Sequence, residues 1–145
     1  MNLQINFMTE SNLNSLSQNL ILDFDDFWNF NILKSEFENP SSTYIVAKIG
    51  DEIVGFAGIW KSVDDVHITN IVTKKNKRNL GIASQLLEKL IEISKTKKVG
   101  SITLEVNENN IPAINLYKKY NFQILGKRKK YYNNADNAII MTLYL

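Results

Sequence analysis

The stretch Arg78-Asn79-Leu80-Gly81-Ile82-Ala83-Ser84 is the most informative part of the sequence, because it leads from a basic residue through a turn into an amphipathic run. The apolar residues of that run, Leu86, Leu87, Leu90 and Ile93, recur at the spacing of one helix face. A helix that starts here directs the free N–H groups of its first turn, and the positive end of its dipole, at one point. The sequence therefore predicts an anion-binding loop that fits a pyrophosphate.

The small residues of this loop support that interpretation. A side chain larger than methyl at Gly81 or Ala83 would keep the backbone away from phosphate oxygens. The loop lacks the first two glycines of a dinucleotide-binding G-x-G-x-x-G, and no Gly-Lys-Ser/Thr of a P-loop follows it. Taken alone, however, the segment is equally typical of an ordinary glycine-containing turn between a strand and a helix.

Two downstream runs distinguish these interpretations, namely Leu104-Glu105-Val106-Asn107-Glu108-Asn109-Asn110 and Ala113-Ile114-Asn115-Leu116-Tyr117. Together with the loop they resemble the Arg/Gln-x-x-Gly-x-Gly/Ala and L-E-V-x-x-x-N…A-x-x-L-Y motifs of the GNAT family of N-acetyltransferases, in its RimI-type branch. The resemblance covers essentially the whole chain, because it extends to Trp28 and Glu38-Asn39-Pro40 and to Tyr131-Tyr132 and Asp136-Asn137-Ala138-Ile139-Ile140-Met141. It implies direct acetyl transfer, in a ternary complex, from acetyl-CoA to a protein's N-terminal α-amine. In that branch the acceptor is the N-terminal alanine of a small-subunit ribosomal protein.

Composition excludes several other classes of protein. The 145 residues fit one domain, expected to span 1–145. With no cysteine and a single histidine, His67, the chain offers no disulfide, no thiolate nucleophile and no Cys-based or multi-histidine metal site, so no metal is expected. No apolar stretch is long enough to span a membrane and the N-terminus lacks a signal-peptide pattern, which predicts a cytoplasmic protein without a membrane partner.

Charge is unevenly distributed along the chain. Residues 1–70 carry ten acids and three lysines, whereas residues 71–145 carry fourteen bases and five acids. Such asymmetry suits a protein in which one half holds a polyanion and the other attracts a cation. We expect a cationic protein N-terminus as the partner and no direct nucleic acid binding. Solvated surface charge remains the alternative explanation for most individual residues.

Apolar periodicity predicts the order of the elements. Strands are expected at about Leu3–Phe7, Thr43–Ile49, Glu52–Trp60, Val66–Thr73, Ile102–Val106, Phe122–Lys129 and Ala138–Tyr144. Helices are expected with apolar faces at Leu13, Leu16 and Leu20, at Phe30, Leu33 and Phe37, after Gly81, and after Asn110. The result is an α/β fold, which the resemblance makes a single-domain GNAT fold. Such a fold has a mixed, mostly antiparallel sheet with a splayed central parallel pair and flanking helices.

The resemblance also assigns the residues that would bind acetyl-CoA. It places the acetyl and pantetheine groups along Ile71, Val72 and Thr73, where a backbone N–H could polarise the thioester carbonyl, and the phosphates on Arg78, Asn79, Leu80, Gly81, Ile82, Ala83 and Ser84. Asn110 would cap a helix and contact pantetheine. Asn121 stands where a glycine usually follows the tyrosine helix, and it can adopt the same left-handed cap.

Two side chains are expected to transfer protons. Glu105 is the candidate general base, because alternation along its strand points it away from Ile102, Leu104 and Val106. Tyr117 is the candidate acid for the departing thiolate, with packing on an apolar helix face as the alternative. His67 is an alternative base, although a surface histidine on a sheet is the commoner role.

The acceptor site is expected to involve Asp25, Asp26 and Trp28 near the start of the chain, with Tyr131 and Tyr132 from a final loop over Lys130–Asn137. Two other functions remain open: a GNAT enzyme for a small amine or a lysine side chain, and a non-catalytic acyl-CoA-binding module.

Overall fold

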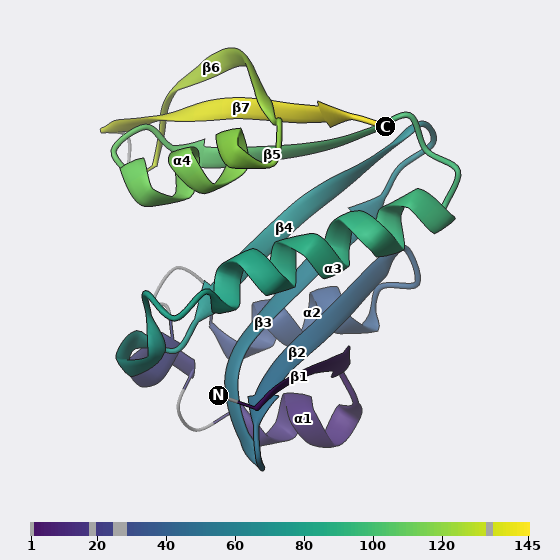
Figure 1. Ribbon diagram of the computed structural model, residues 1–145, viewed down its shortest axis with the longest axis vertical. Coiled ribbons are helices and arrows are strands. Elements are labelled where there is room, and N and C mark those ends of the chain that lie inside the picture. Colours follow the sequence, from purple (N-terminus) through teal and green to yellow (C-terminus); the bar gives the residue numbers. More distant parts are fainter. Residues whose placement is uncertain (1, 18–19, 25–28, 133–134) are drawn as a thin grey trace. The chain divides into compact units, whose positions relative to one another are not determined.

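The computed structural model describes residues 2–17, 20–24, 29–132 and 135–145, with the backbone alone for residues 21, 22 and 130–132 (Figure 1). Its elements, in order, are β1 (Leu3–Phe7), α1 (Glu10–Ser15), η1 (Leu20–Phe24), α2 (Phe30–Glu38), β2 (Ser42–Ile49), β3 (Glu52–Lys61), β4 (Asp65–Thr73), η2 (Lys75–Lys77), α3 (Ile82–Thr96), β5 (Ser101–Asn107), α4 (Ile111–Lys119), β6 (Gln123–Tyr132) and β7 (Asp136–Tyr144).

The strands form one seven-stranded sheet in the order β1-β2-β3-β4-β5-β7-β6. β4 and β5 run parallel, with Asp65, Val66 and His67 opposite Ser101, Ile102 and Thr103. The other pairs whose register is described are antiparallel. The expected mixed, mostly antiparallel α/β fold is therefore confirmed.

The chain forms two compact units. The first comprises Met1–Trp60 and Thr69–Ile93, and the second comprises Lys61–Ile68 and Ser94–Leu145. β4 begins in the second unit and ends in the first, so the loop before α3 belongs to the first unit and β5 with α4 to the second.

The core of the first unit lies between β2–β4 and the helices α1, η1 and α2. Its buried members are Met8, Leu13, Leu16, Leu20, Phe24, Leu33, Tyr44, Val46, Phe56 and Val72. Successive strand residues face opposite sides of a sheet, and Gly55, next to Phe56, faces α3. A Cβ atom at Gly55 would lie 3.1 Å from both Ile82 Cγ2 and Leu86 Cδ1. The absent side chain thus allows the first turn of α3 to pack closely on β3.

The second unit contains the strand that carries Glu105. Along β5, Ile102, Leu104 and Val106 are buried while the intervening residues are half-buried, as expected from their alternation. α4 ends in a left-handed residue, Asn121, with φ of 72°. The N–H groups of Asn121 and Phe122 bond the carbonyls of Lys118 and Tyr117, so the predicted left-handed cap is confirmed as a Schellman motif.

Two expected boundaries were wrong. The first helix ends at Ser15 rather than reaching Leu20, because the hydroxyls of Ser15 and Ser17 bond the carbonyls of Asn12 and Asn14 in its last turn. Leu20 instead begins η1, a π-helical turn.

The second wrong boundary concerns the end of the chain. β6 extends to Tyr132, which pairs with Asp136 of β7, so Tyr131 and Tyr132 belong to a strand and not to the expected loop. Tyrosine has high strand propensity, and the pair Tyr132 and Asp136 continues the ladder beyond an irregularity between Arg128 and Tyr132. Among the residues that the structure describes, no helix has the length and apolar character needed to cross a bilayer.

Candidate active site

The loop before α3 has the geometry expected of an anion-binding turn. Asn79 and Gly81 have left-handed φ angles of 65° and 79°, and such turns orient successive N–H groups into a concave nest. The first bond within α3 runs from Gln85 N to Gly81 O, at 3.2 Å. The N–H groups of Ile82, Ala83 and Ser84 therefore have no acceptor within the helix and lie at its positive end.

Arg78, the basic residue of the motif, is held by main chain. Its Nη2 donates a hydrogen bond to the carbonyl oxygen of Phe24, the last residue of η1, at 3.2 Å. The Phe24 ring is buried and lies 5.5 Å from the ring of Phe56, measured between centroids. Arg78 thus attaches the loop to the core of the first unit. Its guanidinium makes this hydrogen bond within the protein itself.

The end of β4 lies in the same unit as this loop. Val72 is buried in the core, and Lys74 N donates to Val54 O at 2.8 Å, which holds this end of β4 against β3. Just before Ile71, the side-chain amide of Asn70 is buried, and neither Oδ1 nor Nδ2 has a hydrogen-bond partner among the residues that the structure describes. A buried amide without a partner costs free energy, and a hydrogen bond to a ligand would recover it. Asn70 lies on the strand where pantetheine is expected, so its amide is a candidate contact for that group.

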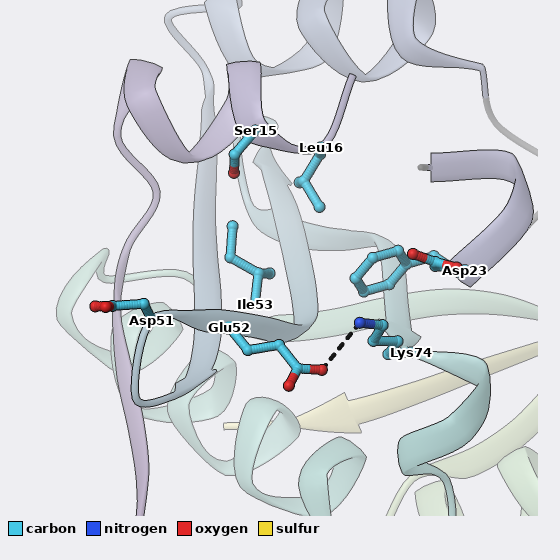
Figure 2. Close-up of a pocket in the computed structure, with 8 residues that line it drawn as sticks. Ser15, Leu16, Asp23, Asp51, Glu52, Ile53 and Lys74 are labelled. Carbon is cyan, nitrogen blue, oxygen red and sulfur yellow. Dashed lines mark hydrogen bonds and ion pairs between the residues drawn. The ribbon is translucent and has the colours of Figure 1, made fainter. Parts of the chain in front are cut away.

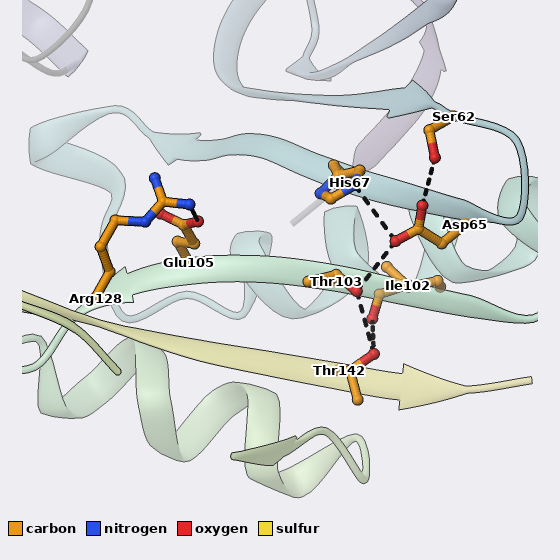
Figure 3. Close-up of polar contacts among 8 residues, drawn as sticks. All are labelled: Ser62, Asp65, His67, Ile102, Thr103, Glu105, Arg128 and Thr142. Atoms are coloured by element: carbon orange, nitrogen blue, oxygen red, sulfur yellow. Dashed lines mark hydrogen bonds and ion pairs between the residues drawn. The ribbon is translucent and has the colours of Figure 1, made fainter. Parts of the chain in front are cut away.

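In the second unit, Glu105 lies on the accessible face of β5 and contacts an arginine (Figure 3). Its Oε1 is 2.9 Å from Nη2 of Arg128, a residue of β6. The side chain of Glu105 remains 27% exposed, so a solvent molecule or a substrate amine can reach the carboxylate. The orientation predicted for Glu105 is correct, whereas its partner was not predicted.

Tyr117 and Asn110 lie on α4 in the same unit. Asn110 caps the helix, because its side chain accepts a hydrogen bond from Ala113 N at 3.3 Å. Tyr117 is 9% exposed, and its ring lies 5.7 Å from that of Phe122 between centroids. Tyr117 therefore contributes to packing, and this contact does not involve the hydroxyl that an acid would use.

His67, the alternative base, belongs to a polar network on the parallel strand pair (Figure 3). Its Nε2 lies 3.3 Å from Asp65 Oδ2. The carboxylate of Asp65 also accepts hydrogen bonds from Ser62 Oγ at 2.6 Å and from Thr103 Oγ1 at 3.4 Å. Asp65 and His67 therefore belong to a surface network that joins β4 to β5. This network favours a structural role for His67 over a catalytic one.

A separate pocket of about 210 Å³ opens in the first unit (Figure 2). It contains three carboxylates, one ammonium and an apolar wall, contributed by Asp23, Asp51, Glu52, Lys74, Leu16, Phe24 and Ile53, with Ser15 at its rim. Lys74 Nζ is 2.9 Å from Glu52 Oε2, so the cation is already paired. None of the residues predicted to bind acetyl-CoA lines this pocket, and we assign it no catalytic part.

Comparison with known proteins identifies the family. Residues 9–122 match the profile of the Acetyltransferase (GNAT) family. The chain belongs to this family.

The chain is also similar to individual GNAT proteins. It is 34% identical over 124 residues to a [ribosomal protein bS18]-alanine N-acetyltransferase of Haemophilus influenzae, covering 81% of this chain and 82% of that one. A Bacillus subtilis protein, assigned provisionally by its name to the same activity, is 39% identical over 105 residues, 72% of this chain and 70% of that one. The crystal structure of the Escherichia coli ribosomal-protein-S18-alanine N-acetyltransferase superposes with a TM-score of 0.89, at 23% identity, covering 99% of this chain and 94% of that one.

Some residues expected at the acceptor side of this GNAT domain lie outside the described part of the chain. They are Asp25, Asp26 and Trp28, and the side chains of Tyr131 and Tyr132 also lie outside it.

The strand that follows those tyrosines is anchored by Glu108, whose Oε2 accepts a hydrogen bond from Asn137 N at 2.9 Å. That hydrogen bond lowers the pKa of Glu108 below its ordinary value.

Two residues of the candidate site were missed by reasoning from the sequence. Arg128 stands in the basic run Lys127–Lys130, a pattern typical of solvated charge. Because successive strand residues face opposite sides of a sheet, Arg128 points to the other side from Lys127 and Lys129. Asn70 stands between Thr69 and the apolar pair Ile71 and Val72 of β4, and its sequence neighbours do not indicate that its amide is buried.

Proposed function

We propose that this GNAT protein transfers the acetyl group of acetyl-CoA to the N-terminal α-amine of a protein, with the N-terminal alanine of ribosomal protein bS18 as its acceptor. The observation that carries the proposal is the accessible carboxylate of Glu105 on β5. Its neighbours along the strand, Leu104 and Val106, are buried in the second unit. The name of the relative from Haemophilus influenzae supports the same acceptor. A reaction of this kind belongs in the cytoplasm and needs neither a membrane nor a nucleic acid partner.

Features of the first unit fit acetyl-CoA as the donor. The free N–H groups at the start of α3 and the left-handed residues Asn79 and Gly81 suit the pyrophosphate. The buried amide of Asn70, which has no partner within the described part of the chain, suits a ligand that carries amide groups, as pantetheine does. In this proposal Ile71, Val72 and Thr73 bind the pantetheine arm through their backbone, and Asn110 contacts it from α4.

The chemistry requires an uncharged amine, and Glu105 supplies the base. An α-ammonium has a pKa of about 8, against about 10.4 for a lysine side chain. Near neutral pH an α-amine is therefore uncharged far more often than a lysine amine, and the Glu105 carboxylate accepts the proton that the nitrogen loses when it forms the amide. The nitrogen then attacks the thioester carbonyl, whose oxygen would be polarised by a backbone N–H of Val72 or Thr73, a contribution of roughly 3 kcal/mol per donor.

The departing thiolate needs a proton, which we assign to the Tyr117 hydroxyl. A phenol can donate a proton and be restored from solvent. The buried ring fixes the side chain against Phe122, so the hydroxyl would be presented from one orientation only. Packing and proton donation are compatible in this arrangement, since the ring and the hydroxyl serve separate purposes.

A comparison of acceptors tests the proposal. Initial rates of CoA release are measured with a peptide that begins with the bS18 N-terminal alanine, the same peptide acetylated at its N-terminus, an N-blocked lysine peptide and a free polyamine. We expect turnover only with the free α-amine, and a loss of about 10²-fold or more in Glu105→Gln with unchanged acetyl-CoA affinity. Faster turnover of the polyamine or the lysine peptide would support the small-amine or lysine enzyme, and binding without turnover would support the acyl-CoA-binding module.

A further inference from the structure

We propose that Arg128 is a positioning residue that orients the Glu105 carboxylate and makes the acceptor site selective for uncharged α-amines. This inference rests on the proposed function, since it assumes that Glu105 receives the amine proton. The contact that carries it is the 2.9 Å separation between Arg128 Nη2 and Glu105 Oε1 (Figure 3).

The register of three strands explains how the two side chains meet. β7 lies between β5 and β6, with Ile140 opposite both Glu105 and Gly126. Arg128 is opposite Ala138, two residues from Ile140 along β7. Residues two apart on a strand share a face, so Glu105 and Arg128 lie on the same side of the sheet.

Ala138 allows the arginine to cross the intervening strand. Neighbouring strands lie about 4.8 Å apart, so Arg128 must extend over the whole width of β7 to reach β5. The residue at that position, Ala138, is buried and presents only a methyl group. Because Ala138 is opposite Asn107 of β5, Arg128 reaches Glu105 diagonally, and a larger side chain at Ala138 would leave the guanidinium less room.

The pair changes the charge that an incoming amine meets. Glu105 alone would attract a cationic ammonium, whereas Glu105 with Arg128 at 2.9 Å is a neutral pair. Such a site gives a protonated amine little electrostatic gain and admits the free base. At neutral pH the free-base fraction of an α-amine exceeds that of a lysine side chain about two hundredfold. A site that binds only the free base therefore favours an α-amine over a lysine side chain.

The contact is not needed to hold the fold together. The side chains of Arg128 and Glu105 are 53% and 27% exposed, and ion pairs between exposed groups contribute little to stability. Removal of the guanidinium should therefore be visible in catalysis and not in folding. Lys127 provides a matched control, because it is on the same strand and its Nζ lies 3.6 Å from a different carboxylate, Glu108 Oε1.

The experiment compares Arg128→Gln, Arg128→Lys and Lys127→Gln with the parent protein, on the alanine-first peptide and on the N-blocked lysine peptide. In Arg128→Gln we expect kcat for the alanine-first peptide to fall about tenfold, because the base is no longer oriented. The KM for acetyl-CoA and the melting temperature should stay at the parent values. The preference for the α-amine over lysine should shrink several-fold, Arg128→Lys should recover part of kcat, and Lys127→Gln should behave as the parent.

An Arg128→Gln protein with parental kcat and parental selectivity would overturn the inference. So would an equal loss in Lys127→Gln, since that would indicate a general effect of charge on β6. Failure of the proposed function looks different: the parent itself would then not turn over the alanine-first peptide, or Glu105→Gln would retain full turnover.

Discussion

Arg78 Nη2 donates a hydrogen bond to the backbone carbonyl of Phe24 at 3.2 Å. This bond joins the loop that precedes α3 to η1, and the Phe24 ring continues the connection into the core through Phe56. The basic residue of the GNAT motif therefore has a structural partner in the first unit. Its contribution to cofactor binding would come from fixing the loop as well as from its charge.

Replacement of Arg78 by alanine should weaken CoA binding without abolishing catalysis. The loop loses both a charge-assisted hydrogen bond, which contributes about 1.5–3 kcal/mol, and a cation beside the phosphates. We expect the dissociation constant measured by calorimetry to rise about tenfold or more, with kcat at saturating acetyl-CoA largely retained. The control is Lys95→Ala, in the last turn of α3, which should bind CoA normally. Unchanged affinity in Arg78→Ala would show that Arg78 has no part in the cofactor site.

Replacement of Gly81 by valine should reduce CoA affinity selectively. Gly81 has a φ of 79°, and a Cβ atom there would meet no atom within 4 Å. The substitution therefore strains the backbone in the free protein and obstructs only a ligand that approaches the loop. Calorimetry should show a large loss of affinity for CoA and little loss for a pantetheine fragment without the pyrophosphate.

Gly50→Val is the matched control for this experiment. Gly50 also has a left-handed φ, of 60°, and a Cβ atom there would likewise meet no atom within 4 Å, but it lies in the turn between β2 and β3. It should lose comparable stability and keep its CoA affinity. If Gly81→Val weakens CoA and the pantetheine fragment equally, the loop does not bind the phosphates.

Tyr117→Phe should separate packing from proton donation. Phenylalanine retains the ring that lies against Phe122, so the unfolding free energy should change by less than about 1 kcal/mol. Turnover should fall but persist, because water can supply a proton to the thiolate. Chemical denaturation and initial rates measure the two effects. A destabilised variant with normal specific activity would instead assign Tyr117 to the core alone.

Acid should destabilise the protein partly through two carboxylates with lowered pKa values. The hydrogen bond from Lys74 lowers the pKa of Glu52, and that from Asn137 N lowers the pKa of Glu108. Both groups therefore contribute stability above their ordinary pKa of 4.5, and this contribution is lost as pH falls through the lower folded value. In urea titrations from neutral pH to about 3, Glu52→Gln and Glu108→Gln should each reduce the slope of stability against pH. A slope identical to the parent would contradict the assignment.

The elements predicted correctly from the sequence are those whose signals are local. The apolar face after Gly81, the alternation around Glu105, the cap at Asn110 and the left-handed Asn121 depend on residues a few positions apart. The end of α1 is also local, but it depends on serine hydroxyls competing for helix carbonyls, which apolar periodicity does not detect.

The partners within the site were less predictable, because they depend on register. Arg128 meets Glu105 only because both face the same side of the sheet across β7. The bond from Arg78 to Phe24 spans 54 positions of sequence. Neither contact leaves a periodic signal in the sequence, and only one residue of each, Arg78 and Glu105, belongs to a motif.

N-terminal acetylation is tested most directly by locating the acetyl group on the product. Ribosomal protein bS18 with a free N-terminal alanine is incubated with acetyl-CoA and the enzyme, and fragment mass spectrometry assigns the modified residue. We predict a single acetyl group on the α-amine of the alanine, formed about 10²-fold more slowly when Glu105→Gln replaces the parent enzyme. Acetylation confined to lysine side chains, or none at all, would rule out N-terminal acetylation of bS18 as the activity.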